Sequence, residues 1–432
     1  MFKAGNRRGI IRRIEHRLAH RVEKTAARIA LRSGAREWAL ISLAPKGAPR
    51  GRVLVSHQIE LFLPEVRDHF ARRHNQYIEA EAMAETLLEM GYAVDLVSAR
   101  RMHPVSERHY DAMIAHRDNF EQLAATLPPD CLRIAYLDMT HWTFNNHASL
   151  GRSLDVEATR GITPETTRMV KPNRAIENAH CAILMGHEQA WETYAFARKP
   201  IYEIVNLAIT SHPRPIQKDI DACRKRFIWF GSNGLAHKGL GIVLEAFAHM
   251  PEMHLTVCGP LDCKPEFCRA YHHELQGCPN IEALGWVDPT GPDFAALAAR
   301  TLGLVFPSCA EAQAGAVLNC MQAGLIPIVS RQTNVRIDPS MGVELAGDRT
   351  EDVIAAVREL AARPADELQA MALNSWDLIA RRHSRAAYKR NLTQVLENIF
   401  TRYPDLPSPG FIPLADALPA IDYGTTQTEP VW

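Results

Sequence analysis

The sequence predicts an α/β protein made of two Rossmann-like, doubly wound parallel-sheet domains. Apolar runs of strand length alternate with helical patterns along most of the chain, and this alternation is typical of parallel sheets covered by helices. A length of 432 residues, of which 47% are hydrophobic, favours two domains with sizeable cores. The stretch 210–215 contains two prolines and no periodicity, so we expect it to link the two domains.

Composition and charge narrow the class of protein. Charged residues make up 23% of the chain and the formal net charge is zero, which is ordinary for a globular protein. The nine cysteines form no CxxC pair, and no apolar run approaches the ~20 residues that span a bilayer. We therefore expect a cytoplasmic protein with reduced thiols, without a metal site and without a cofactor.

A basic segment opens the chain. Residues 1–36 hold eleven Lys and Arg against two Glu, and residues 6–33 place apolar side chains at three- and four-residue steps, as an amphipathic helix does. Such a helix suits an anionic membrane surface, which would place the protein peripherally on the inner face of the membrane. Packing on the protein itself or on a second copy is the alternative. A nucleic-acid arm is disfavoured because residues 6–33 contain no aromatic side chain to stack on bases.

The first domain is expected over residues 51–209. Its strand-like runs are 52–56, 92–97, 110–116, 132–138, 179–185 and 201–206. A short strand is also expected within 38–43, before this domain. A helix should start near Gln76 and end at Gly91, and Asn75 has the side chain of a good N-cap for it.

Polar and aromatic residues follow the fourth of these strands. The run 139–147 has the composition of a cleft lining, and we expect 152–173 to be a polar surface segment. Arg168 in that segment is interpreted as part of a solvated basic face, with contact to an anionic acceptor as the alternative. Asp138 and His116 stand at the ends of strands and are weaker site candidates.

The second domain is expected over residues 216–383. Its first strand, 226–230, runs into Gly231-Ser232-Asn233-Gly234 and then Lys238-Gly239 before a helix. A strand that ends in a glycine-containing turn before a helix exposes backbone N–H groups and the positive end of the helix dipole to an anion. Lys238 adds a point charge that suits a phosphate.

The same pattern recurs later in this domain. The strand 302–306 leads into a polar turn that carries Glu311, a helix starts at Gly315, and a further strand covers 326–330. Ligands of doubly wound sheets bind at the carboxyl ends of the strands, which is where Glu311 would lie.

Helical patterns dominate the end of the chain. We expect helices at 350–362 and 365–381 and a last helix over 384–402 with an apolar stripe. The remainder, 403–432, contains several prolines and is expected to be a loose tail.

Together these motifs resemble the C-terminal half of the group-1 (GT-B fold) nucleotide-sugar glycosyltransferases. The glycine turn with Lys238-Gly239, then Pro307-Ser308, Glu311, Gly315 and the run Ala-x-Gly-x-Pro at 323–327 stand in the order that this family has. The opening strand–loop–helix–strand unit is similar to the family's first unit. The resemblance implies the GT-B fold, in which two Rossmann-like domains face a central cleft and the last helix crosses back to the first domain.

The resemblance also implies roles for single residues. Gly231, Ser232, Asn233, Lys238 and Gly315 would bind the nucleotide-sugar donor, and Glu311 would orient its sugar. His141 would contact the sugar or the leaving group from the first domain, so that His141 and Glu311 form the catalytic pair.

Two positions depart from the family pattern. A second Glu of the family, which holds the nucleotide ribose, corresponds to Asn319, whose amide can hydrogen-bond without charge. The family also often has an Arg beside its first glycine turn, where Ser232 and Asn233 stand here.

The implied function is sugar transfer. The resemblance implies a metal-independent, hexosyltransferase-type enzyme that moves a sugar from a nucleotide-diphosphate sugar to a glycan or lipid-linked acceptor, with retention, in cell-surface polysaccharide biosynthesis. A non-catalytic sugar-binding or scaffold protein of the same fold is the alternative. A different two-domain α/β enzyme, such as an epimerase or a phosphorylase, is the third hypothesis.

Overall fold

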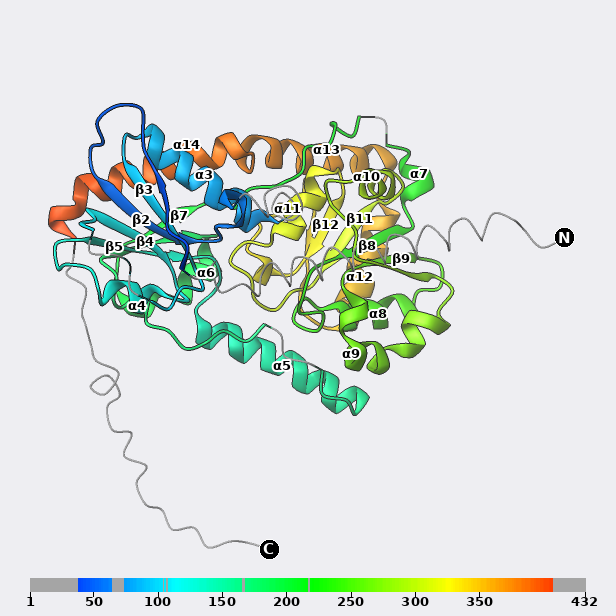
Figure 1. Cartoon of the computed structure of the whole chain (residues 1–432). Coiled ribbons are helices and arrows are strands. Elements are labelled where there is room, and N and C mark those ends of the chain that lie inside the picture. The colour runs from blue at the N-terminus through cyan, green and yellow to red at the C-terminus, as the bar shows by residue number, and fades with distance from the viewer. Residues whose placement is uncertain are drawn as a thin grey trace, which may run out of the picture.

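The computed structural model describes residues 38–63, 74–103, 105, 108–164, 168–216 and 218–406. Within these ranges, two parallel sheets form the centres of two α/β domains that lie side by side (Figure 1). The predicted helix over 6–33 and most of the predicted tail lie outside the described residues.

Sheet A is the centre of the first domain and has the strand order β1-β3-β2-β4-β5-β6-β7. Its strands are β1 Ile41–Leu43, β2 Arg52–His57, β3 Ala93–Ser98, β4 Ala112–His116, β5 Leu132–Leu137, β6 Cys181–Met185 and β7 Ile201–Ile204. Only the edge pair of β1 and β3 is antiparallel. The short strand expected within 38–43 is therefore β1, and it extends this sheet.

Sheet B is the centre of the second domain and has the strand order β10-β9-β8-β11-β12-β13. Its strands are β8 Arg226–Phe230, β9 His254–Cys258, β10 Ile281–Gly285, β11 Gly303–Phe306, β12 Ile326–Val329 and β13 Val343–Glu344. All pairs are parallel, and central strands such as β11 are buried along their whole length. The prediction of two doubly wound parallel sheets is confirmed.

Helices cover the faces of both sheets. In the first domain and the connecting segment they are α3 Asn75–Glu89, α4 Phe120–Ala124, α5 Trp142–Arg160, α6 Glu188–Glu192 and α7 Ile220–Cys223. The later helices are α8 Leu240–Ala248, α9 Pro265–Ala270, α10 Pro292–Ala299, α11 Gly315–Gln322, α12 Thr350–Ala362, α13 Ala365–Arg382 and α14 Arg385–Arg402. Of the helices in the described ranges, none combines the length and the apolar composition needed to cross a membrane.

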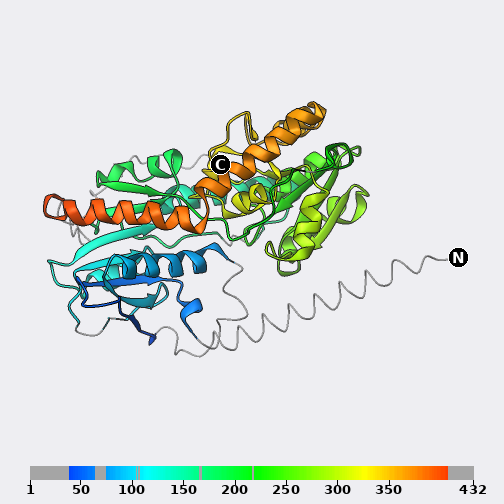
Figure 2. The same ribbon diagram turned by 90° about the horizontal axis from the view of Figure 1, so that it is seen from above.

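The last helix, α14, returns to the first domain as the resemblance implied. Figure 2 shows α13 and α14 following one another along the top of the molecule, from the second domain to the first. The stripe of α14 enters the core of the first domain with Tyr388, Leu392, Val395, Leu396 and Ile399. At its start, ion pairs with α3 add to this packing, so α14 ties both domains together.

Helix α5 occupies residues 142–160, where the sequence predicted a cleft lining and a polar surface segment but no helix. The helix begins at Trp142, runs for 19 residues and extends beneath the second domain (Figure 1). Near its end, Arg160 forms ion pairs with Glu245 at 2.6 Å and Glu274 at 2.8 Å. Its buried residues are mostly polar, namely Asn145, Ser149, Arg152, Ser153 and Val156. Hydrophobic periodicity could not find the helix, because its inward face carries so few apolar residues.

A buried carboxyl group lies between α3 and α14. Glu79 is 1% exposed, and the Tyr136 hydroxyl donates to its Oε2 at 3.3 Å. Burial raises the pKa of Glu79 to about 8, against the lowering effects of the Tyr136 hydrogen bond and of His116. Glu79 is therefore protonated at neutral pH.

The pH dependence of stability follows from this proton. The folded protein keeps the Glu79 proton up to about pH 8, whereas the unfolded chain releases it near the model-peptide value of 4.5. The contribution of Glu79 to the free energy of unfolding therefore decreases as pH rises from 4.5 to about 8, by up to about 1.4 kcal/mol per pH unit. In urea unfolding measured from pH 5 to 8, the free energy of unfolding of Glu79→Gln should increase relative to that of the wild type as pH rises. A Glu79→Gln variant whose stability ran parallel to that of the wild type over this pH range would show the interpretation to be wrong.

Candidate active site

Lys238 and Glu311 lie side by side at the carboxyl edge of sheet B. Lys238 is in the turn between β8 and α8, and Glu311 is in the turn between β11 and α11. Because β8 and β11 are neighbouring parallel strands, their turns emerge at the same edge. The Lys238 Nζ is 2.5 Å from the Glu311 Oε1, and the two residues are only 6% and 8% exposed. The structure therefore brings together the two residues on which the predicted site depends.

Polar groups hold the Glu311 carboxylate in place. The Ser308 hydroxyl donates to Oε1 at 3.0 Å, and the Arg168 guanidinium is 3.4 Å from Oε2. Burial raises the pKa of Glu311, but the charges of Lys238 and Arg168 outweigh it and lower the pKa to about 2. Glu311 is therefore ionised at neutral pH and is flanked by two cations.

The glycine turn after β8 is shaped by the side chain of Trp229. The indole Nε1 donates to the Lys238 carbonyl oxygen at 3.1 Å. A Cβ atom on Gly231 would lie 2.6 Å from the indole ring, so only glycine fits at this position. Ser232 and Asn233 are exposed at the tip of the turn, where they are free to face a ligand.

The first residues of α11 and α3 meet between the domains. A Cβ atom on Gly315 would lie 2.9 Å from the Asn75 side chain. The N-termini of the two helices, which carry the positive ends of their dipoles, therefore lie close together. Gly315, the first residue of α11, is four positions after Glu311 in the sequence. Asn75 donates from Nδ2 to the Leu207 carbonyl oxygen, and the prediction that it caps α3 is wrong. The N-cap is His74, whose side chain accepts from the backbone N–H of Gln76.

Asn319 contacts the segment that connects the domains. It lies in the middle of α11 and is 3% exposed, and its Oδ1 accepts from the backbone N–H of Ile209 at 3.0 Å. Gln313 is bound to the same segment, because its Oε1 accepts from the backbone N–H of Asn206 at 2.7 Å. The structure thus gives Asn319 a partner within the chain, and its predicted role toward a ribose stays a prediction.

His141 lies at the start of α5, among aromatic side chains of the first domain. Its ring packs edge-on against Tyr194 and Phe196, and its Nδ1 is 2.7 Å from the Thr143 hydroxyl. Burial lowers the pKa of His141 to about 4, so the ring is neutral at pH 7. The buried Nε2 has no hydrogen-bond partner within the described residues. The structure does not pair His141 with Lys238 or Glu311, and its contact with a sugar stays a prediction.

A second charged cluster lies at the carboxyl edge of sheet A. The His116 Nε2 is 3.0 Å from the Asp138 Oδ2, which also accepts from the Gln76 side chain at 2.7 Å. Arg117 forms an ion pair with the other carboxylate oxygen of Asp138. These partners fix Asp138 between two strand ends and the start of α3, as expected for a weaker site candidate.

Helix α5 carries first-domain side chains to the site. The Ser149 hydroxyl is 2.6 Å from the Nδ1 of His237, whose Nε2 is 2.6 Å from the Ala310 carbonyl oxygen. Since the carbonyl can only accept, His237 donates from Nε2, and its Nδ1 accepts from Ser149. Arg152 donates to the Pro307 carbonyl oxygen at 3.3 Å. The first domain therefore binds both turns that position Lys238 and Glu311.

Sequence reasoning did not single out these supporting residues. Ser149 and Arg152 fell in a segment that lacks a helical hydrophobic pattern, and Arg168 was interpreted as a solvated cation. Ser308 is part of the recognised motif Pro307-Ser308 and His237 stands next to Lys238, but neither was given a role, and their polar side chains were the available signal. Only the packing of the two domains shows which of them face the site.

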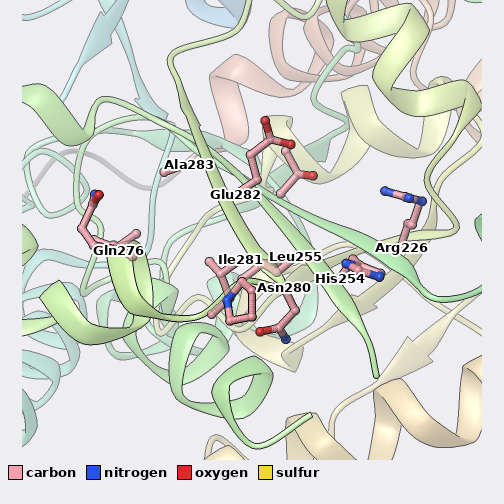
Figure 3. Close-up of a pocket in the computed structure, with 11 residues that line it drawn as sticks. Arg226, His254, Leu255, Gln276, Asn280, Ile281, Glu282 and Ala283 are labelled. Atoms are coloured by element: carbon pink, nitrogen blue, oxygen red, sulfur yellow. The ribbon is translucent and has the colours of Figure 1, made fainter. Parts of the chain in front are cut away.

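A separate surface hollow lies away from this edge. It has a volume of about 520 Å³ and is lined by Arg226, His254, Asn280 and Ile281 among others (Figure 3). Arg226, His254 and Ile281 are the first residues of β8, β9 and β10. Ligands of doubly wound sheets bind at the opposite, carboxyl ends, so we do not assign the site to this hollow.

Gly186 keeps the two domains in close contact. It follows β6 with φ +134°, and a Cβ atom there would lie 2.2 Å from the Ala312 carbonyl oxygen. We expect Gly186→Ala to push the domains apart and to lower the free energy of unfolding by about 2 kcal/mol. Denaturant unfolding and small-angle X-ray scattering measure the two effects.

Gly161 is the matched control for this change. It also has a positive φ, +66°, but no atom lies within 4 Å of a Cβ built there. Gly161→Ala should show only a backbone cost of about 1 kcal/mol, with unchanged scattering. Identical behaviour of the two variants would rule out the close contact as the cause.

The arrangement of two facing doubly wound domains and a returning last helix defines the GT-B fold. Three solved structures of modest similarity share this fold. Sucrose-phosphate synthase from Thermosynechococcus elongatus is 10% identical with a TM-score of 0.55, over 82% of this chain and all of that chain. A glycosyltransferase from Rickettsia africae is 10% identical with a TM-score of 0.54, over 81% and 98% of the two chains. HepE from Anabaena, solved with UDP-glucose, is 14% identical with a TM-score of 0.52, over 81% and 100%.

The family comparison concerns the second domain. The model of the family "Glycosyl transferases group 1" matches residues 224–363, from just before β8 to just past α12, which include Lys238 and Glu311. The resemblance drawn from the motifs is thereby confirmed for residues 224–363, which match the group 1 glycosyl transferase model within a chain that has the GT-B fold. No curated protein sequence matches the chain.

Proposed function

We propose that the protein is a glycosyltransferase that moves a sugar from a nucleotide-diphosphate sugar to a glycan or lipid-linked acceptor. The observation that carries this proposal is the buried Lys238–Glu311 pair at the carboxyl edge of sheet B. A cation beside a carboxylate suits a ligand with an anionic diphosphate at one end and sugar hydroxyls at the other.

Sugar transfer requires stabilisation of the departing diphosphate and orientation of the sugar, and residues of this site can provide both. Cleavage of the bond between the anomeric carbon and the phosphate oxygen leaves negative charge on the diphosphate, which Lys238 and the N–H groups of the glycine turn would stabilise. Glu311 would accept hydrogen bonds from sugar hydroxyls and orient the ring. Retention, absence of a metal requirement and a place in cell-surface polysaccharide synthesis are parts of the proposal that come from the family resemblance.

A ligand must open the domains before it can bind. Lys238 and Glu311 bind each other in the structure, and both are almost fully buried. Donor binding would separate this ion pair, so that Lys238 turns to phosphate and Glu311 to the sugar. Closure over the ligand would then exclude water from the reaction.

The test is nucleotide release from a panel of nucleotide-sugars by the full-length protein. Because HepE was solved with UDP-glucose, UDP-sugars come first in the panel. Release that depends on an added glycan acceptor supports the proposal. A thermal shift with a nucleotide-sugar but no release would instead favour the alternative of a sugar-binding protein without catalytic activity. The hydrogen bond between Asn319 and the backbone N–H of Ile209 supports this alternative, because it occupies the Asn319 side chain. Neither shift nor release with any member of the panel would overturn both.

The predicted membrane contact concerns residues 1–36, which lie outside the described residues. It is retained as part of the proposal because a lipid-linked acceptor would lie at a membrane surface. Cytoplasmic location at the inner face of the membrane is proposed on the same ground.

A further inference from the structure

Arg168 brings a cation from the first domain into the candidate site. Its guanidinium is 3.4 Å from the Glu311 Oε2, while Lys238 contacts the other carboxylate oxygen at 2.5 Å. Its side chain also lies over the glycine turn, because a Cβ atom on Gly234 would be 2.4 Å from the Arg168 Cγ. With two cations on one carboxylate, these three groups carry a net charge of about +1.

The backbone around Arg168 is clamped by the first turn of α5. The Asn145 side chain donates to the Arg168 carbonyl oxygen at 2.7 Å. The Asn146 side chain accepts from the Val170 N–H and donates to the Val170 carbonyl oxygen, both at 2.8 Å. These bonds fix the segment on α5, which is itself bound to the second domain. Arg168 is thus held in position by a rigid element.

The Arg168 guanidinium has unused capacity to donate. Its Nε is buried and has no hydrogen-bond partner in the part of the chain that the structure describes. The 3.4 Å contact to Glu311 is long for a charge-assisted hydrogen bond, which is normally nearer 2.8 Å. A planar guanidinium with free donors suits two phosphate oxygens at once.

We propose that Arg168 binds the diphosphate of the sugar donor and supplies the second cation that the glycine turn lacks. The tip of that turn holds Ser232 and Asn233, which are uncharged, so Lys238 alone would face a diphosphate with two or more negative charges. Because Arg168 belongs to the first domain, its cation reaches the leaving group only when the domains are closed. This inference rests on the proposed function for its ligand, and it couples bond cleavage to domain closure.

The test uses inorganic pyrophosphate as the probe, since this anion carries the charges without the nucleoside or the sugar. Calorimetric titration of the full-length protein should show that Arg168→Ala weakens pyrophosphate binding about tenfold or more. Arg168→Lys should recover part of the loss, because it keeps the charge and loses the planar fork. Lys171→Ala, which removes an exposed cation from the same segment, should bind as the wild type does.

A second titration, with UDP and with uridine, separates the ligand role from a structural role. If Arg168 contacts phosphate, Arg168→Ala should weaken UDP binding and leave uridine binding unchanged. Equal pyrophosphate affinity of Arg168→Ala and the wild type would overturn the inference, as would a wild type that does not bind pyrophosphate at all. A wild type that binds pyrophosphate through Arg168 yet releases nucleotide from no nucleotide-sugar would leave the inference standing and overturn only sugar transfer.

Discussion

Replacing Lys238 by alanine is expected to lower turnover of the nucleotide-sugar by about 100-fold or more. Removal of one preorganised group that stabilises charge in the transition state has an effect of this size in other enzymes. Lys238 is 6% exposed, and its Nζ sits at the carboxyl edge of sheet B against Glu311. In this water-poor position its charge acts on a departing diphosphate with little screening. Single-turnover assays of nucleotide release at saturating donor would measure the loss in the chemical step itself.

Stability must be separated from activity in this experiment. Removing Lys238 leaves the buried Glu311 carboxylate with only the 3.4 Å contact to Arg168 as an ionic partner, at a cost of up to about 3 to 5 kcal/mol. The double variant Lys238→Met with Glu311→Leu removes both charges and should recover much of that stability. It should nevertheless remain as inactive as Lys238→Ala. Near-normal turnover of a folded Lys238→Ala or Glu311→Ala protein would remove that residue from the mechanism.

Truncating Leu396 to alanine is expected to lower the free energy of unfolding by about 3 kcal/mol, within the range of buried leucines. Leu396 is fully buried in the core of the first domain, although it lies in the last helix of the chain. The lost contacts would loosen α14 from α3, and with it the link that returns from the second domain. Urea unfolding followed by tryptophan fluorescence and by circular dichroism measures the change.

Leu154 provides the matched control for that truncation. It is also a helical leucine, but it is 62% exposed on α5. Leu154→Ala should change the free energy of unfolding by less than about 0.5 kcal/mol. If both truncations had the same effect, α14 would not be anchored in the core as the structure shows.

Short-range sequence patterns predicted much of the fold and part of the candidate site. The glycine turn, Lys238 and the turn with Glu311 each follow a buried apolar strand, and parallel strands necessarily place such turns at one edge. The helices α12, α13 and α14 begin at or next to the predicted residues, because the apolar stripe of each helix lies within its own segment. Asn75 shows the limit of such signals: it is a favourable capping residue, yet His74 caps α3 and Asn75 reaches across to Leu207.

By itself, the sequence determined the two parallel sheets, the resemblance of the second domain to the group 1 glycosyl transferases, and the turns in which Lys238 and Glu311 stand. Their signals are short-range: a strand, a turn and a helix start within about fifteen residues. The tertiary structure alone decided that 142–160 is a helix, that Ser149 and Arg152 bind the turns of the second domain, and that Arg168 lies beside Glu311. The physical reason is that the inward face of α5 is largely polar. Its partners are hydrogen-bonding groups of the other domain, so no apolar period along the chain encodes their meeting.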